Sequence, residues 1–147
     1  MNITFIQTGG TIDKDYPRTT KGYAFEISEP AVKRILEKLN PDFNYEIISV
    51  TKKDSLDINE EDRKKILEAC KKTKNDKIII THGTDTMLET AKYLNTQNST
   101  EQTIILPKNT HLVQINKIKL LNLTNKDGIE YSKDIDILIE ILSKTKN

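Results

Sequence analysis

Short apolar, β-branched runs alternate along this chain with stretches in which apolar residues recur every three or four positions. The apolar runs predict strands over residues 3–7, 45–50, 77–80 and 103–106. The helical spacing between them predicts helices over about 30–39, 59–72 and 86–94. Such alternation is typical of a mainly parallel sheet with helices on both faces. We therefore predict a single α/β domain over residues 1–147, with a doubly wound, three-layer fold of Rossmann-like or flavodoxin-like type.

The other segments carry weaker patterns. A polar connection over 11–27 has some extended character around Tyr23. Asn59 is a good amino-terminal cap, and acidic residues follow it in the first turn, where the helix dipole favours anions. Toward the carboxyl end we expect three further features: one or two strands over 111–123, a turn at 126–128 and an amphipathic helix over 134–142.

Composition excludes several classes of function. The chain has 23 basic and 22 acidic residues, so its net charge of +1 favours neither a nucleic acid nor a membrane as partner. No apolar run approaches the roughly 20 residues that span a bilayer, and the chain starts without a signal-peptide pattern. Cys70 is the single cysteine, at a predicted core position, so no intramolecular disulfide can form. We expect a cytoplasmic protein, with no metal site at its two separated histidines, His82 and His111.

Polar, glycine-containing segments follow three successive predicted strands. Residues 8–12 (Thr-Gly-Gly-Thr-Ile) follow the first, Ser55 lies after the second, and residues 81–86 (Thr-His-Gly-Thr-Asp-Thr) follow the third. In a doubly wound sheet, ligands bind outside the carboxyl ends of the strands, near the point where the strand order reverses. One pocket could therefore collect hydroxyls, the Asp85 carboxylate and backbone N–H groups at Gly10.

A purely structural interpretation exists for each segment. Residues 8–11 can form a tight turn, and Thr84, Asp85 and Thr86 can cap the next helix, which is the commonest task of such residues. The occurrence of all three segments at successive strand ends favours the functional interpretation.

Together these residues resemble the amino-terminal domain of bacterial-type L-asparaginases, a family with glutaminase-asparaginases and an amidotransferase subunit among its relatives. The resemblance is carried by residues 8–12, Tyr23, Asp54-Ser55 and residues 81–86, and it covers residues ~3–105. It implies an amidohydrolase that transfers an acyl group to a hydroxyl and then to water, with no cofactor.

The resemblance also implies a role for each matching residue. Thr11 matches the nucleophile, and Tyr23 matches a tyrosine that covers it on a mobile flap. Ser55 matches the serine that holds the substrate's α-carboxylate, and Asp85 the aspartate that binds its α-amino group. Thr84 matches a second reactive threonine, which works with the aspartate and a downstream lysine. Gly10 would contribute to substrate binding through its backbone.

The match ends at about Leu106. The family's Gly-Ala-Met-type turn is replaced by Leu106–Asn109, and neither the family lysine nor its carboxyl-terminal domain is recognisable; Lys108, Lys117 and Lys126 match no motif. Three hypotheses stay open: an amidohydrolase acting on L-asparagine or a related amide, an inactive or weakly active module that binds a small amino acid, and a half-enzyme completed by a partner. A homo-oligomer is compatible with each, because a domain without its usual partner surface exposes apolar area.

Overall fold

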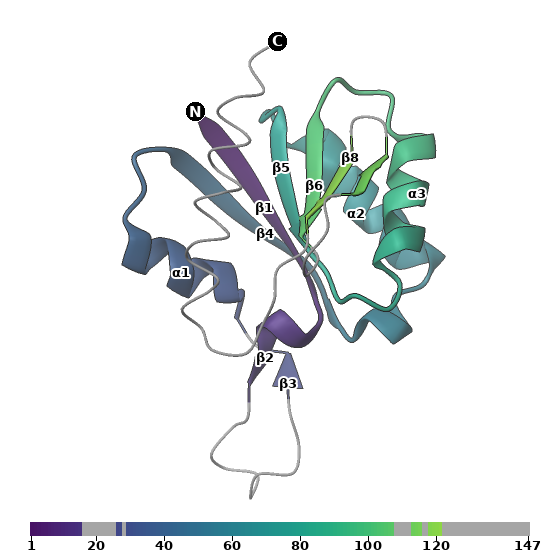
Figure 1. The fold of residues 1–147 in the computed structure, drawn as a ribbon, viewed down its shortest axis with the longest axis horizontal. Coiled ribbons are helices and arrows are strands. Elements are labelled where there is room, and N and C mark those ends of the chain that lie inside the picture. Colours follow the sequence, from purple (N-terminus) through teal and green to yellow (C-terminus); the bar gives the residue numbers. More distant parts are fainter. Residues whose placement is uncertain (16–25, 28, 108–112, 116–117, 122–147) are drawn as a thin grey trace, which may run out of the picture.

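A six-stranded sheet forms the centre of the computed structural model, which describes residues 1–15, 26–27, 29–107, 113–115 and 118–121 (Figure 1). Its strands lie in the order β4-β1-β5-β6-β8-β7. All neighbouring pairs are parallel except β7 and β8, which are antiparallel. The bounds are β1 (Asn2–Gly9), β4 (Asn44–Lys53), β5 (Lys77–Thr81), β6 (Thr103–Pro107), β7 (Val113–Ile115) and β8 (Ile118–Leu121).

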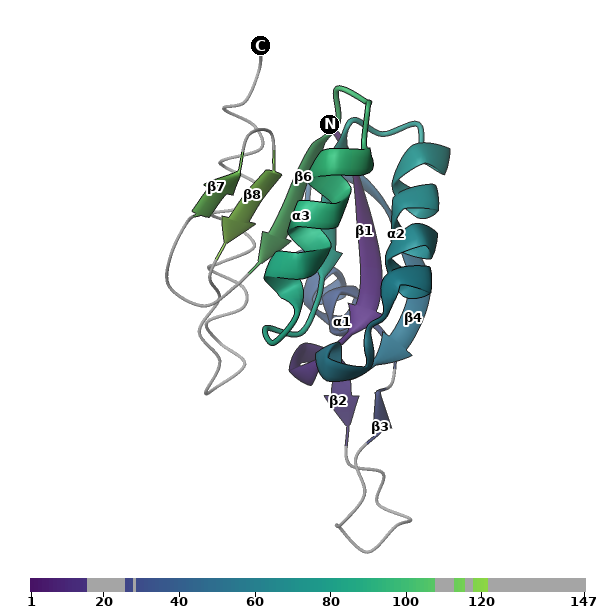
Figure 2. The ribbon, with the colours of Figure 1, turned by 90° about the vertical axis from the view of Figure 1, so that its right-hand side faces the viewer.

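Helices cover both faces of this sheet, as the sequence predicts. α1 (Ala31–Leu39) lies on one face, and α2 (Glu60–Lys72) and α3 (Met87–Gln97) lie on the other (Figures 1 and 2). The three-layer α/β fold is thus confirmed. Within this sheet β1 lies between β4 and β5, which are its second and third strands in chain order, and this is the flavodoxin-like order. Among the described residues, no helix is long and apolar enough to cross a membrane.

Alternation along the buried strands divides the core between the two faces. Ile3 and Phe5 of β1 pack toward α1 with Leu36, whereas Ile6 packs toward α2 and α3 with Ile66 and other apolar residues. Successive side chains of a strand point to opposite faces, so one continuous apolar run supplies both cores. Cys70 belongs to the second core, and burial raises the pKa of its thiol to about 12.

The helix boundaries follow local sequence chemistry. Asn59 begins α2 with a capping box, in which its side chain accepts from the Asp62 N–H and the Asp62 side chain accepts from the Asn59 N–H, both at 3.0 Å. α1 begins after Pro30, which supplies no side-chain cap, and it ends at Asn40 in a left-handed conformation with φ 43°.

A distant residue supplies the missing cap of α1. Asp13 closes the 3-10 turn η1 (Thr11–Asp13) after β1, and its Oδ1 accepts from the Ala31 N–H at 2.7 Å. The carboxyl is buried, which raises its pKa, and its Oδ2 has no hydrogen-bond partner among the described residues. Between these two residues the short strands β2 (Lys14–Asp15) and β3 (Glu26–Ile27) pair antiparallel, so Asp15 and Glu26 lie side by side.

Several predicted features lie outside the described residues: Tyr23, His111, the lysines Lys108, Lys117 and Lys126, the turn at 126–128 and the helix over 134–142.

Candidate functional site

Two glycines at the end of β1 bring three strand ends together. Gly9 and Gly10 have φ values of 111° and 86°, which other residues rarely adopt. A Cβ on Gly9 would lie 2.3 Å from the Lys53 carbonyl oxygen at the end of β4, and one on Gly10 would lie 2.5 Å from the Gly83 nitrogen after β5. Only glycine permits this packing. The Gly10 N–H donates to the Lys53 carbonyl oxygen at 2.9 Å, and a role of Gly10 in substrate binding stays a prediction.

Ser55 is held in a fixed position just after β4. It begins the 3-10 turn η2 (Ser55–Asp57), in which Asp54 is the cap and accepts from the Leu56 N–H at 3.2 Å. Lys14 of β2 forms an ion pair with Asp54 at 3.0 Å, and this contact is the main reason that the pKa of the Asp54 carboxyl is lowered. The Ser55 side chain is buried, with 2% of the residue exposed.

The structure joins Ser55 to Asp85, although they come from different strand ends. The Ser55 hydroxyl donates to Asp85 Oδ2 at 2.8 Å, and the Asp85 N–H lies 3.3 Å from the same hydroxyl oxygen. Asp85 and Thr84 are exposed on the loop between β5 and α3. A carboxylate has more acceptor positions than one serine occupies, so Asp85 can also accept from an ammonium group. The pair can therefore face a small zwitterion.

Simple helix capping does not explain this loop. Thr86 occupies the cap position of α3, yet its side chain makes no capping hydrogen bond and donates instead to the Ser55 carbonyl oxygen. The Asp85 carboxylate likewise binds Ser55 rather than the helix end. Capping thus accounts for neither side chain, whereas a structural role does fit Thr8, whose hydroxyl donates to the Thr81 carbonyl oxygen at 2.7 Å.

The other predicted residues are placed less completely. Thr11 begins η1 immediately after β1, so its backbone lies at the same edge of the sheet as Ser55 and Asp85. Gly10, which precedes it, is in close contact with Gly83. The predicted partner Tyr23 lies outside the described residues.

Sequence reasoning missed His82, which it considered only as a metal ligand. The side chain is buried, Nδ1 lies 2.6 Å from the Gly83 carbonyl oxygen, and Nε2 lies 2.9 Å from the Thr90 hydroxyl. Thr90 also accepts from Arg63 Nε at 3.2 Å. No local sequence pattern indicates these contacts, because Thr90 and Arg63 lie on two different helices.

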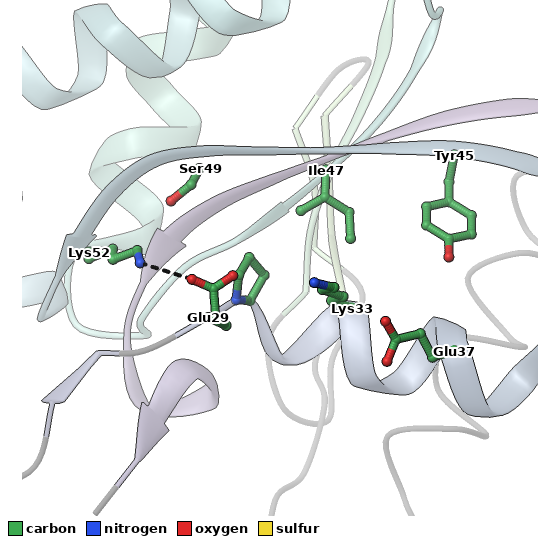
Figure 3. Close-up of a pocket in the computed structure, with 8 residues that line it drawn as sticks. Glu29, Lys33, Glu37, Tyr45, Ile47, Ser49 and Lys52 are labelled. Carbon is green, nitrogen blue, oxygen red and sulfur yellow. Dashed lines mark ion pairs between the residues drawn. The ribbon is translucent and has the colours of Figure 1, made fainter. Parts of the chain in front are cut away.

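A cavity of about 400 Å³ lies elsewhere, between α1 and the edge strand β4 (Figure 3). Its charged side chains include Glu29 and Lys52, which form an ion pair at 3.6 Å, and Lys33 and Glu37 on α1. None of the predicted site residues that the structure describes lines it. The cavity is therefore a separate surface feature.

In α/β domains, polar side chains near the switch point, outside the carboxyl ends of parallel strands, are the usual place of a small-molecule site. Comparison with known proteins makes this class specific. The family model described as "Asparaginase, N-terminal" matches residues 2–107, and this chain belongs to the asparaginase family. The boundary agrees with the extent of the resemblance in the sequence, to about residue 105.

The relatives are asparaginases of greater length. A probable periplasmic L-asparaginase of Haemophilus influenzae is 33% identical over 112 residues, which cover 71% of this chain and 31% of that protein. The thermostable L-asparaginase of Thermococcus kodakarensis aligns with a TM-score of 0.59 at 25% identity, covering 73% of this chain and 33% of that one. A probable cytoplasmic L-asparaginase of Campylobacter jejuni gives 0.55 at 28% identity, covering 71% and 34%. The chain thus spans about a third of these relatives, which differ in compartment, so its own compartment stays a prediction.

Proposed function

We propose that this chain is an asparaginase-like amidohydrolase that releases ammonia from L-asparagine or a related amide. The observation that carries the proposal is the contact of 2.8 Å between Ser55 and Asp85, at the strand edge where Thr11 begins η1. Membership of the asparaginase family supports the reaction class, and the paired serine and aspartate support an amino-acid substrate.

In this proposal, substrate binding divides between two side chains. Asp85 accepts from the substrate's α-ammonium group, and the Ser55 hydroxyl turns from Asp85 to the α-carboxylate. Ser55 is buried and Asp85 is exposed, so the substrate approaches from the Asp85 side. The reacting amide then extends toward the ends of β1 and β5, where Thr11 and Thr84 are located.

The chemistry proceeds through an ester. The Thr11 hydroxyl oxygen attacks the side-chain amide carbon, the hydroxyl proton passes to the departing nitrogen, and ammonia leaves. Water then attacks the ester carbon, which releases the carboxylic acid and returns the proton to Thr11. The flap that carries Tyr23 would exclude bulk water during the first step, and Thr84 would supply the second hydroxyl. Metal and organic cofactors have no role in this scheme.

A coupled ammonia assay tests the proposal. We expect purified protein to release ammonia from L-asparagine, and Thr11→Ala to abolish release, because the nucleophile is lost. Thr96→Ala is the matched control, since Thr96 is exposed on α3 and bonds only to its own helix. Equal release by wild type and Thr11→Ala would refute the role of Thr11.

A second candidate function is amino-acid binding without turnover. The joined Ser55 and Asp85 favour it, because they form a binding pair that does not depend on the family's lysine. Calorimetric titration with L-aspartate and L-asparagine separates the two candidates. Binding that disappears in Asp85→Ala, in a protein that releases no ammonia, would support this second function, whereas the absence of heat with either ligand would exclude it.

A further inference from the structure

His82 lies under the candidate site and uses both ring nitrogens. It is 5% exposed, with Nδ1 at 2.6 Å from the Gly83 carbonyl oxygen and Nε2 at 2.9 Å from the Thr90 hydroxyl oxygen. Thr90 is fully buried on α3, and Arg63 reaches it from α2 with Nε at 3.2 Å. Three elements thus meet at one imidazole: both helices on this face and the loop that carries Asp85.

The direction of every hydrogen bond in this chain follows from its ends. A carbonyl oxygen can only accept, so Nδ1 carries the proton and donates to Gly83. In a neutral imidazole Nε2 must then accept, and the Thr90 hydroxyl donates to it. Arg63 Nε can only donate, which leaves the Thr90 oxygen as its acceptor. Each group therefore donates to the next one: Arg63 to Thr90, Thr90 to His82, and His82 to Gly83.

Burial favours the neutral ring. It is the largest influence on the pKa of His82 and lowers it; the positive charge of Arg63 lowers the pKa further, whereas the hydrogen bond to Gly83 and the charge of Glu89 each raise it by less than burial lowers it. Protonation would make Nε2 a donor, so the Thr90 hydroxyl, which already accepts from Arg63, would have to accept from Nε2 as well and turn its own proton away from the ring.

Gly83 lies at the centre of the site. Its nitrogen, in the peptide with His82, and its Cα are the nearest atoms to a Cβ built on Gly10, and the Ser55 side chain lies 2.6 Å from a Cβ built on Gly83. The carbonyl that His82 contacts belongs to the next peptide, between Gly83 and Thr84. A trans peptide is planar, so fixing the Gly83 carbonyl also fixes the direction of the Thr84 N–H, on the opposite side from His82. Rotation of this peptide would move Thr84 and Asp85 relative to Ser55.

We propose that His82 is a positioning residue, which Thr90 and Arg63 hold in its Nδ1–H tautomer. The ring orients the peptide between Gly83 and Thr84 and so sets the geometry of Ser55 and Asp85. The inference rests on the proposed function only where ligand binding is measured. Its structural part concerns the ring and the loop alone.

Long-range nitrogen-15 NMR of the imidazoles tests the structural part. The chain has two histidines, so His111→Gln leaves His82 as the only ring signal. In that background we expect a protonated Nδ1 and an unprotonated Nε2 at pH 7.5. Thr90→Val removes the hydroxyl with little change of shape, and we expect it to give a mixture of tautomers and to shift the Gly83 and Thr84 amide signals. Thr90→Ser keeps the hydroxyl and should restore the wild-type spectrum, whereas Thr96→Val controls for a threonine-to-valine change on the same helix.

Binding of L-aspartate, measured by calorimetry on the same variants, tests the consequence. We expect Thr90→Val to weaken binding about tenfold, a modest loss equal to one misdirected hydrogen bond, and Thr90→Ser to bind as wild type does. If wild type binds nothing, the proposed function fails while the tautomer and amide signals still decide the role of His82. An Nε2–H tautomer in wild type would overturn the proposal, as would unchanged Gly83 and Thr84 signals in folded Thr90→Val.

Discussion

Replacement of Gly10 by alanine should destabilise the domain strongly, because this position combines two separate requirements. At φ 86° the residue lies in the left-handed region, which costs a residue with a Cβ roughly 1–2 kcal/mol. The new Cβ would also lie 2.5 Å from the Gly83 nitrogen and 2.6 Å from its Cα. These are backbone atoms, so the clash cannot be relieved by a change of rotamer, and overpacking of this kind costs about 1–3 kcal/mol.

The two costs sum to about 2–5 kcal/mol, a large share of the roughly 5–15 kcal/mol that stabilises a typical domain. Urea unfolding followed by circular dichroism measures the loss as a lower midpoint at an unchanged slope. Gly83→Ala is the matched control. Gly83 has no positive φ, and its Cβ would meet the Ser55 side chain at 2.6 Å, so we expect the steric cost alone, about 1–3 kcal/mol.

The comparison has a clear point of failure. A Gly10→Ala protein within about 0.5 kcal/mol of wild type would refute the close approach of the β1 and β5 ends, since such a change is typical of an unconstrained surface position. If the two variants lost equal unfolding free energy, the positive φ of Gly10 would contribute nothing and the steric contact alone would account for the loss.

Three further predictions concern other parts of the fold. Asn59→Ala should lower the free energy of unfolding by about 1 kcal/mol, because the Asp62 N–H loses its cap. Thermal melting measures this loss, and Asn98→Ala, at the carboxyl end of α3, should have less effect. Cys70 should resist thiol reagents at pH 8 in the folded protein and react once urea unfolds it, because burial raises its pKa to about 12; rapid labelling without urea would contradict its place in the core. The pKa of His82 is lower in the folded state than its ordinary value of about 6.5, so the unfolded chain takes up this proton first. Stability should therefore decline as pH falls below about 6.5. Arg63 on α2 opposes the ring's positive charge and Glu89 on α3 favours it, and His82→Gln should flatten the decline measured by urea unfolding.

Much of the fold was predictable because its signals are local. The buried strands β1, β5 and β6 are apolar runs, and α2 has both its cap and its periodic apolar face within one segment. The rough alternation after residue 111 predicted one or two strands, and the structure forms β7 and β8 there.

The errors occur where long-range contacts decide. β4 continues through Lys53, beyond the predicted end at residue 50, because Lys53 pairs with Gly9 after a register shift that no local pattern reveals. α3 likewise extends to Gln97, past the predicted end at Leu94. The last turn of α3 carries polar residues, which give no apolar periodicity to detect.

The candidate site was predictable in its position and less so in its contacts. Ser55 and Asp85 were expected after successive strands of the chain, and the structure joins them directly although β1 lies between these two strands in the sheet. The buried carboxyl of Asp13 had no sequence signal, since its partner Ala31 offers only a backbone N–H. His82 was misjudged because a histidine's partners, here on two helices, cannot be identified from its neighbours in sequence.

The bond between Asp13 and Ala31 has a consequence for how this family of domains can diverge. Because β2 pairs with β3 and Asp13 holds Ala31, the two ends of the intervening segment are fixed side by side, so a change in its length need not displace β1 or α1. Doubling the number of residues between two such fixed ends adds only about 0.6 kcal/mol to the free energy of closing them, if the added residues are flexible. An insertion between Asp15 and Glu26 should therefore cost little folding free energy while the sheet stays constant.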